Sequence, residues 1–229
     1  ETAIELINYE ADDLIATYSE QIIKKGGEVT IVSSDKDLMQ LYKKNIRIYD
    51  PMKNKFINEE DIKKKFGVNA EKVIDVQSLA GDSSDNVPGV PGIGIKTAAE
   101  LINEYGNLEN LLSNSKNIKQ NRRRETLIEN KQKAMISKKL VTLKKDVPVK
   151  VPYSEFILKQ IDKKKLYNFL RDMEFNRLLS SAISTYGEVD FEDNKKELSG
   201  PRPRPKKVNR NLSWRTVLSW TAVLSWTRP

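Results

Sequence analysis

The sequence predicts a mixed α/β fold that continues into a mostly helical region. Residues 10–25 carry apolar side chains at the spacing of an amphipathic helix, and two glycines end it. Residues 28–34 (EVTIVSS) are rich in β-branched side chains and predict a short buried strand, with acidic residues just past its carboxyl end. Because ligand sites in α/β folds gather beyond the carboxyl ends of strands, this acidic stretch is a candidate site.

The remaining elements follow in chain order. Residues 46–50 and 55–58 predict a short strand pair around Pro51, and residues 59–67 predict a brief helix closed by Gly67. Further helical patterns occupy residues 70–81, 95–106, 108–113, 122–137 and 162–175, whereas residues 140–145 and 148–151 are typical of extended chain. Helices therefore dominate the chain after residue 59.

The chain changes character after about residue 190. Residues 191–207 have the charge and proline content of a linker that cannot fold alone. The final stretch repeats Leu-Ser-Trp three times at a spacing of six and holds every Trp of the chain, so these Leu and Trp side chains would share one face of an extended segment. We expect residues 191–229 to be a linker and a disordered tail, either a frameshifted or appended end or an interaction segment.

Composition restricts the chemistry that the chain can perform. Its 229 residues include no Cys and no His, which excludes disulfides, thiolate nucleophiles, imidazole bases and the usual zinc ligands. Catalysis must then rest on carboxylates, lysines, hydroxyls or a hard metal ion. The net charge of +8 overstates the basic character of the body, because residues 201–229 carry seven basic side chains and no acidic one. No pattern of a membrane span or signal peptide occurs, so we expect a cytoplasmic protein without a membrane partner.

Carboxylates gather at three places near the ends of predicted elements. They are Glu10, Asp12 and Asp13; Asp35 and Asp37; and Asp82 and Asp85. Taken singly, these groups fit plainer roles, namely helix capping, a solvated turn and an Asx turn. Seven carboxylates brought together would repel one another unless cations neutralised them, and without His or Cys those cations would be Mg²⁺ or Mn²⁺. Two such ions about 4 Å apart serve nucleases and polymerases, and the spacing does not choose between the two.

A glycine-rich turn follows the third acidic group. Gly89, Gly92 and Gly94 permit positive φ and a close approach of backbone N–H groups to a ligand, and the helix that begins next favours an anion at its amino terminus. Lys96 and Thr97 add a positive charge and a hydroxyl there. The pattern predicts a phosphate-binding turn, and a simple corner between two helices is the alternative.

Basic side chains are concentrated between residues 116 and 145, where eleven of them accompany two acidic ones. Arg122, Arg123 and Arg124 form the densest part of this run. Contact with a phosphate backbone, independent of base sequence, would explain the run. A solvated helix surface is the alternative.

Three segments together resemble, in order and spacing, the 5′–3′ exonuclease domain of bacterial DNA polymerase I, a relative of the flap endonucleases. They are EADD, SSDKDLMQL and LAGDSSDNVPGVPGIGIKTAAELI, and the similarity covers about residues 1–190. The resemblance implies part of a PIN-like nuclease core in residues 1–58 and a helix-three-turn-helix DNA-binding module in residues 59–190. It also implies a bacterial, nucleoid-associated monomer that removes RNA primers and repairs DNA.

The substrates implied are double-stranded DNA with a 5′ flap, a nick or an RNA primer, cut with two Mg²⁺ or Mn²⁺ ions, with a fused or separate DNA polymerase domain as a partner. The resemblance assigns metal-binding or catalytic roles to all seven carboxylates. Glu10 and Asp12 match acidic residues that border or bridge the two metals, with Asp13 close behind. Asp35, Asp37 and Asp82 match ligands of the second metal, while Asp85 matches a position that acts through water. Gly89, Gly92, Gly94 and Lys96 match the turn that holds the duplex, where the family also places K⁺.

The chain departs from the family pattern at its beginning. The family has a strand, two Asp ligands and a basic helical arch before the position of Glu10, where this chain has nine residues. We therefore expect a truncated domain that binds DNA and cleaves it poorly or not at all. A non-catalytic module that binds DNA structures is the alternative, and an RNA-directed PIN nuclease is a third, less favoured interpretation.

Overall fold

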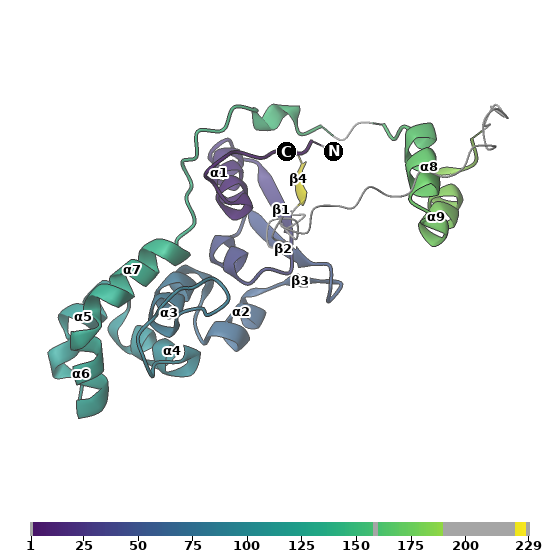
Figure 1. Cartoon of the computed structure of the whole chain (residues 1–229). Helices are drawn as coiled ribbons and strands as arrows, with labels where there is room; N and C mark the ends of the chain where they lie inside the picture. The colour runs from purple at the N-terminus through teal and green to yellow at the C-terminus, as the bar shows by residue number, and fades with distance from the viewer. Residues whose placement is uncertain (1, 158–159, 190–222, 228–229) are drawn as a thin grey trace. The chain divides into compact units, whose positions relative to one another are not determined.

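The computed structural model of the chain, shown in Figure 1, describes residues 2–157, 160–189 and 223–227. These residues divide into two compact units. The larger unit contains residues 3–156 and the strand at 223–227, and residues 160–189 belong to the smaller unit. Among the described residues, none of the helices has both the length and the apolar character of a membrane span.

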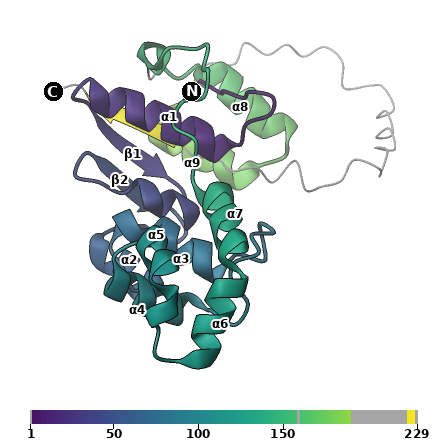
Figure 2. The same ribbon diagram turned by 90° about the vertical axis from the view of Figure 1, so that its left-hand side faces the viewer.

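The larger unit contains a four-stranded sheet in the order β3-β2-β1-β4. The strands are β1 (Glu28–Val32), β2 (Ile46–Asp50), β3 (Lys55–Ile57) and β4 (Val223–Thr227). β1 and β2 are parallel, with Val29 opposite Ile46, whereas β3 and β4 pair antiparallel with their neighbours. The helix α1 (Ala11–Lys24) lies alongside β1 (Figure 2). The helix, the buried strand and the strand pair predicted from the sequence are confirmed.

The strand β4 falls in the segment predicted as a disordered tail, and that prediction is wrong for residues 223–227. Its backbone pairs with β1, with Val223 opposite Val32 and Thr227 opposite Glu28. The physical reason is that an edge strand presents a row of unpaired N–H and C=O groups, and a segment rich in β-branched and aromatic residues satisfies them readily. The rest of the predicted linker and tail, residues 191–222 and 228–229, lies outside the described residues.

A mostly helical region follows the sheet, as predicted. Its helices are α2 (Glu59–Phe66), α3 (Val73–Ala80), α4 (Ile95–Tyr105), α5 (Leu108–Ser113), α6 (Asn121–Glu129) and α7 (Lys131–Val141). Short 3₁₀ helices are η1 (Asp37–Leu41), η2 (Ala70–Lys72), η3 (Ser115–Asn117) and η4 (Tyr153–Glu155). The single helix predicted over residues 122–137 is two helices that meet at Asn130, whose backbone (φ −104°, ψ 18°) is not helical. The Asn130 side chain caps the end of α6 by donating to the Thr126 carbonyl (2.9 Å).

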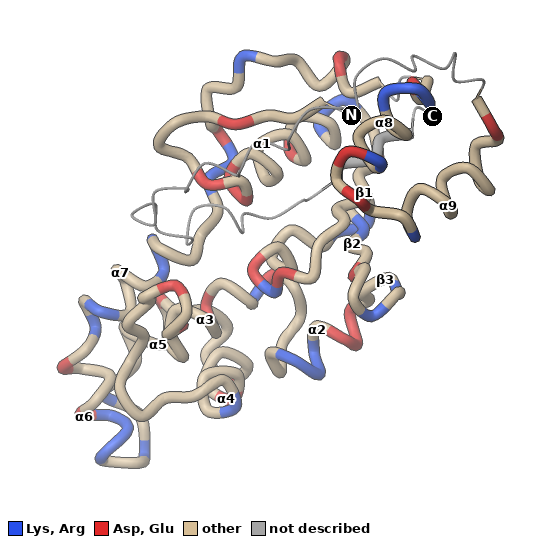
Figure 3. Tube along the Cα trace, turned by 45° about the vertical axis from the view of Figure 1, so that its right-hand side comes forward, with Lys and Arg blue, Asp and Glu red and all other residues tan. Residues whose placement is uncertain are grey.

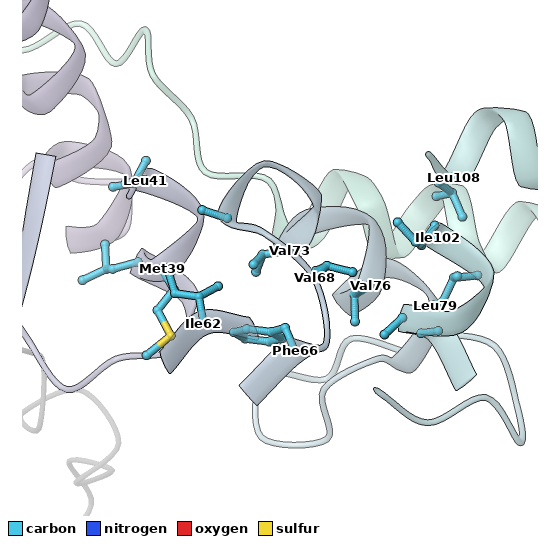
Figure 4. Packing of buried hydrophobic residues seen from close by; sticks show 14 of the residues in the cluster. Met39, Leu41, Ile62, Phe66, Val68, Val73, Val76, Leu79, Ile102 and Leu108 are labelled. Atoms are coloured by element: carbon cyan, nitrogen blue, oxygen red, sulfur yellow. The ribbon is translucent and has the colours of Figure 1, made fainter. Parts of the chain in front are cut away.

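One hydrophobic core joins the sheet to the helices. It runs from Ile31 and Ile48 in the strands, through Phe66 and Val73, to Leu127 in α6. Figure 4 shows its middle part, where Met39 of η1 lies near Ile62 and Phe66 of α2. The core therefore crosses the boundary expected at residues 58 and 59 without interruption, and it fixes the loop after β1 relative to α3.

Residues 142–156 return from α7 to α1. Thr17 accepts from the N–H of Val147 (3.2 Å), and the Tyr18 hydroxyl donates to the Val151 carbonyl (2.8 Å). The buried side chain of Gln40 holds the end of α7, donating to the Val141 carbonyl at 2.9 Å. These contacts explain why the chain after residue 141 is extended but ordered.

The smaller unit contains α8 (Lys163–Asp172) and α9 (Asn176–Tyr186). Asp162 caps α8 by accepting from the N–H of Lys165 (3.1 Å). Tyr167 is fully buried, and its hydroxyl donates to the carbonyl of Gly187 (2.6 Å), so it ties the two helices together. The predicted helix at 162–175 is confirmed, whereas α9 was not predicted because its serines and threonines weaken the helical pattern.

Candidate metal centre

The loop after β1 places two of the predicted ligands. Asp35 accepts from the backbone N–H of Asp37 (2.8 Å), and its own N–H donates to the Ser33 hydroxyl (3.1 Å). These bonds fold the loop into an Asx turn that begins η1. The buried carboxylate of Asp50, at the end of β2, accepts from the Ser34 hydroxyl (2.7 Å) and anchors the same loop.

Asp50 is a structural carboxylate rather than a free ligand. Burial alone would raise its pKa, but hydrogen bonds from Ser34 and Lys53 lower the pKa of Asp50 to about 2. The sequence offered little indication of this role, because a lone Asp before Pro51 is typical of a turn.

The start of α1 brings further carboxylates toward the same loop. Asp12 is half-buried, and its Oδ1 atom is buried without a hydrogen-bond partner. Burial, the charges of Asp35 and Asp37 and the nearby charges of Glu10 and Asp13 raise the pKa of Asp12 to about 7. The first and second predicted acidic groups are therefore electrostatically coupled, as a shared cation site would require.

Asp13 points to a different partner. Its Oδ1 atom accepts from the backbone N–H of Lys144 (2.8 Å) and so holds the returning segment against α1. Glu10 is exposed at the N-cap position just before α1 and makes no side-chain capping bond. Of the three carboxylates at this helix start, Asp13 has a structural role. Asp12, with a buried oxygen that has no hydrogen-bond partner, most resembles a metal ligand.

The second and third acidic groups meet directly. Asp37, Asp82 and Asp85 each offer a carboxylate oxygen, and these oxygens lie within 4.8 Å of one another. We call these three residues the acidic cluster. Asp82 is held in a tight turn, because its N–H donates to the Val87 carbonyl (2.9 Å) and its carbonyl accepts from the Val87 N–H (2.8 Å).

Three residues that sequence reasoning missed contact the acidic cluster: Lys36, Gln77 and Ser84. Lys36 forms an ion pair with Asp82, and the buried Gln77 of α3 donates to Asp37 Oδ1 (2.5 Å). Burial raises the pKa of Asp37 despite the bond from Gln77. Burial would also raise the pKa of Asp82, but the bonds from Lys36 and Ser84 keep it below its usual value. The position of Lys36 between two Asp residues was a signal that could have identified it.

The glycine turn divides into a packed half and an open half. Gly89 has φ +58°, and a Cβ there would lie 2.5 Å from the backbone nitrogen of Gly81. The N–H of Gly89 donates to the buried Ser137 hydroxyl (2.9 Å), so it is not free for a phosphate. Gly92 and Gly94 have open space where a Cβ would be. The close approach of a ligand that we predicted for three glycines is thus available at two.

The basic residues predicted to contact DNA differ in whether their side chains are already engaged within the protein. Arg124 donates to the Ile118 carbonyl (3.0 Å), and Arg123 pairs with Glu100 at 3.9 Å, whereas Arg122 is exposed. Lys96 is exposed and Thr97 half-buried in the first turn of α4. Lys and Arg residues mark α6, its neighbouring turn and parts of α7 in Figure 3. The structure brings the acidic groups together more closely than it does the basic ones.

A groove of about 910 Å³ lies beside the start of α1. Glu10 and Asp13 line it together with Lys139, Lys144 and Lys145. The acidic start of α1 and lysines from the end of α7 and the segment after it thus line one opening.

The donor set suits a hard divalent cation. All candidate ligands are carboxylate oxygens, which Mg²⁺ and Mn²⁺ prefer. The unpartnered, buried Oδ1 of Asp12 is an atom that such an ion would satisfy. The oxygens of Asp37, Asp82 and Asp85 lie close enough together to hold one cation, and the charges of Asp35, Asp37 and Glu10 act on Asp12 beside them.

Comparison with known proteins identifies the family. A family model described as "5'-3' exonuclease, N-terminal resolvase-like domain" matches residues 2–67, and one described as "5'-3' exonuclease, C-terminal SAM fold" matches residues 68–164. DNA polymerase I of Rhizobium leguminosarum is 51% identical over 175 residues, which are 76% of this chain and 17% of that protein. A 5′–3′ exonuclease of Aquifex aeolicus is 39% identical over 186 residues, covering 81% of this chain and 63% of the relative.

Among solved structures, the flap endonuclease of bacteriophage T5 in complex with DNA and metal ions has the same fold. The TM-score is 0.57 at 23% identity, over 61% of this chain and 52% of the phage protein. The chain spans less than two thirds of the length of these relatives. The resemblance and the α/β fold with a mostly helical second part are confirmed. The chain belongs to the 5′–3′ exonuclease family, with the resolvase-like domain matched in residues 2–67 and the SAM-fold domain in residues 68–164.

Proposed function

We propose that the chain is the nuclease part of a DNA polymerase I-type protein, whose reaction is the hydrolysis of phosphodiester bonds at 5′ flaps, nicks and RNA-primer ends, and that the chain as given binds such DNA and cleaves it poorly or not at all. One observation carries the proposal. Asp82 and Asp85 of the acidic cluster and the open glycines of the turn belong to a single segment, residues 81–96. Its first half supplies carboxylates for a cation, and its second half offers backbone to a phosphate.

The carboxylates would hold the metal ions that this family of reactions uses. Asp37 and Asp82, with Asp85, would take one Mg²⁺ or Mn²⁺, and Asp12 and Asp35 would contribute to a second. Bound ions supply positive charge to the oxygens of the scissile phosphate. The residues themselves orient that charge: Gln77 fixes Asp37, and Ser84 fixes Asp82 by donating from its hydroxyl at 2.6 Å.

The duplex would be held at two places. Gly92 and Gly94 admit a phosphate near the amino terminus of α4, where Lys96 and Thr97 add a charge and a hydroxyl, and where a K⁺ ion would have room beside the turn. Lys145, with its neighbours in the groove, would contact the strand beside Glu10. Both contacts read the backbone and not the bases, which suits recognition of DNA structure.

A 5′-flap duplex tests the proposal. Binding is measured by fluorescence anisotropy and cleavage on denaturing gels, with Mg²⁺ or with EDTA, on flaps made of DNA and of RNA. We expect the double variant Asp37→Asn and Asp82→Asn to abolish cleavage and to leave duplex binding within about threefold, since phosphate contacts supply the affinity. The matched control Glu71→Gln, at an exposed carboxylate of η2, should change neither.

The outcomes separate the candidate functions. Cleavage that persists in EDTA or in the double variant would contradict a carboxylate metal centre. Weak cleavage that requires Mg²⁺ would support a nuclease of reduced activity, whereas binding without any cleavage, unchanged by EDTA and by the double variant, would favour a non-catalytic module that binds DNA structures. Selective cleavage of the RNA flap would instead favour an RNA-directed nuclease.

A further inference from the structure

A positive charge already lies inside the acidic cluster. Lys36 immediately precedes η1, and its Nζ forms an ion pair with Asp82 Oδ2. Within the part of the chain that the structure describes, this is the one ion pair that reaches a carboxylate of the cluster. The centre thus contains a cation supplied by the chain itself.

Both carboxylate oxygens of Asp82 are engaged. Oδ1 accepts from the Ser84 N–H (3.0 Å) and hydroxyl (2.6 Å), and Oδ2 is paired with Lys36. Each carboxylate oxygen has two acceptor sites, and the two bonds from Ser84 fill those of Oδ1, so a divalent cation that binds Asp82 at Oδ2 would either share that oxygen with Lys36 or displace a partner. Ser84 is fixed by the turn through its backbone, whereas Lys36 has a flexible side chain that is 33% exposed and can swing into solvent. Lys36 is the partner that would yield.

The charges favour the same exchange. Three carboxylates with oxygens within 4.8 Å repel one another, and the single charge of Lys36 offsets part of that repulsion. A divalent ion offsets more of it, but the ammonium group next to it repels the incoming ion. The lysine consequently stabilises the centre without metal and weakens metal binding.

We propose that Lys36 is a built-in cation of the metal centre, which holds Asp82 in place in the metal-free chain and sets the affinity for the divalent ion by competing with it. This inference rests on the metal centre of the proposed function. Lys36 acts here as a positioning residue for Asp82.

The test uses the full 229-residue chain and Mn²⁺ as the probe. Free Mn²⁺ is followed by electron paramagnetic resonance, and thermal unfolding is followed in EDTA. For Lys36→Met we expect half-saturation at a Mn²⁺ concentration at least about threefold below that of the wild type, because a unit charge a few ångströms away is removed. We also expect a lower Tm in EDTA. A residue with only a structural role would lower the Tm without tightening metal binding.

Two matched variants serve as controls. Lys36→Arg keeps the charge and should bind Mn²⁺ within about twofold of the wild type. Lys43→Met removes a lysine that pairs with Glu20 (3.3 Å) outside the cluster, and it should leave Mn²⁺ binding unchanged. Lys36→Gln is a second neutral variant whose amide can still donate to Asp82, so it preserves the turn if the Met variant unfolds in EDTA. It should show the same tighter binding.

The inference would be overturned if Lys36→Gln reached half-saturation at a Mn²⁺ concentration equal to or above that of the wild type. If the wild type binds Mn²⁺ and both neutral variants bind it equally, the metal centre stands and only the role of Lys36 falls. If the wild type binds no Mn²⁺, the centre and the role of Lys36 fall together.

Discussion

Asp12→Asn should stabilise the metal-free chain at neutral pH. The Asp12 carboxyl is half-buried, has an unpartnered oxygen and lies near four other carboxylates, which together with burial raise its pKa to about 7. An unfolded chain ionises the same group near 3.8. Between these values the unfolded state binds fewer protons than the folded state, so stability falls as pH rises.

The size of the effect follows from the two pKa values. Their separation corresponds to at most about 4 kcal/mol of destabilisation above pH 7, and the amide that replaces the carboxyl carries its own cost of burial. We therefore expect Asp12→Asn to be about 2 to 4 kcal/mol more stable than the wild type at pH 8 in EDTA, and to lose this advantage below pH 4. Urea unfolding followed by circular dichroism at several pH values measures it.

Asp50→Asn is a control with the opposite sign. The pKa of Asp50 is held at about 2, so its ionised form stabilises the fold above pH 4, and that stabilisation is lost as the pH falls through 2. The Asp50→Asn variant should thus be about 2 kcal/mol less stable than the wild type at pH 7. If Asp12→Asn were less stable than the wild type at pH 8, or if its effect did not change between pH 4 and pH 8, burial and charge repulsion would not govern the stability contribution of Asp12.

Three further outcomes are expected. Gly89→Ala should lower the free energy of unfolding in urea by more than about 2 kcal/mol, because φ is positive and a Cβ would clash with the backbone at the end of α3. Gly92→Ala has open space around its Cβ and should lower the free energy of unfolding by about 1 kcal/mol. Equal losses in the two variants would contradict this explanation. In the wild type, Lys138 pairs with the buried Asp75 at 2.7 Å, and Lys138→Met leaves this carboxylate without its cation. The variant should lose about 3 kcal/mol of stability and show a lower Tm in a thermal scan. An unchanged Tm would mean that solvent replaces the lysine. Lys145→Gln should weaken duplex binding and reduce the slope of log K against log salt by up to about 0.9, and an unaltered slope would place the phosphate chain elsewhere.

Local patterns predicted most of the secondary structure. The apolar spacing of residues 10–25, the β-branched run at 28–34 and Gly67 after α2 each specify an element through interactions within a few residues. Failures occurred where those interactions are weak or nonlocal. α9 is rich in Ser and Thr, and β4 exists through pairing with β1, nearly two hundred residues away in the sequence.

The candidate site was predictable as a set of residue types but not as a set of contacts. Carboxylates at three element ends, without His or Cys, were enough to predict a hard cation, and the quoted motifs were enough to predict the family. No pattern, however, indicated that Asp13 binds the backbone of Lys144 or that the N–H of Gly89 is taken by Ser137. Partners that distant in the chain become neighbours only when helices pack.

The amino-acid sequence by itself determined the chemistry available to this protein: an all-oxygen donor set, a glycine turn next to a helix start and a helical basic region. The tertiary structure decided which groups use that chemistry. Packing of α3 against η1 brings Gln77 to Asp37, and the turn after α3 brings Asp82 to Lys36. The physical reason is that the type of a side chain is given by its position in the sequence. Its ionisation state, burial and partners depend instead on which elements pack around it through the core.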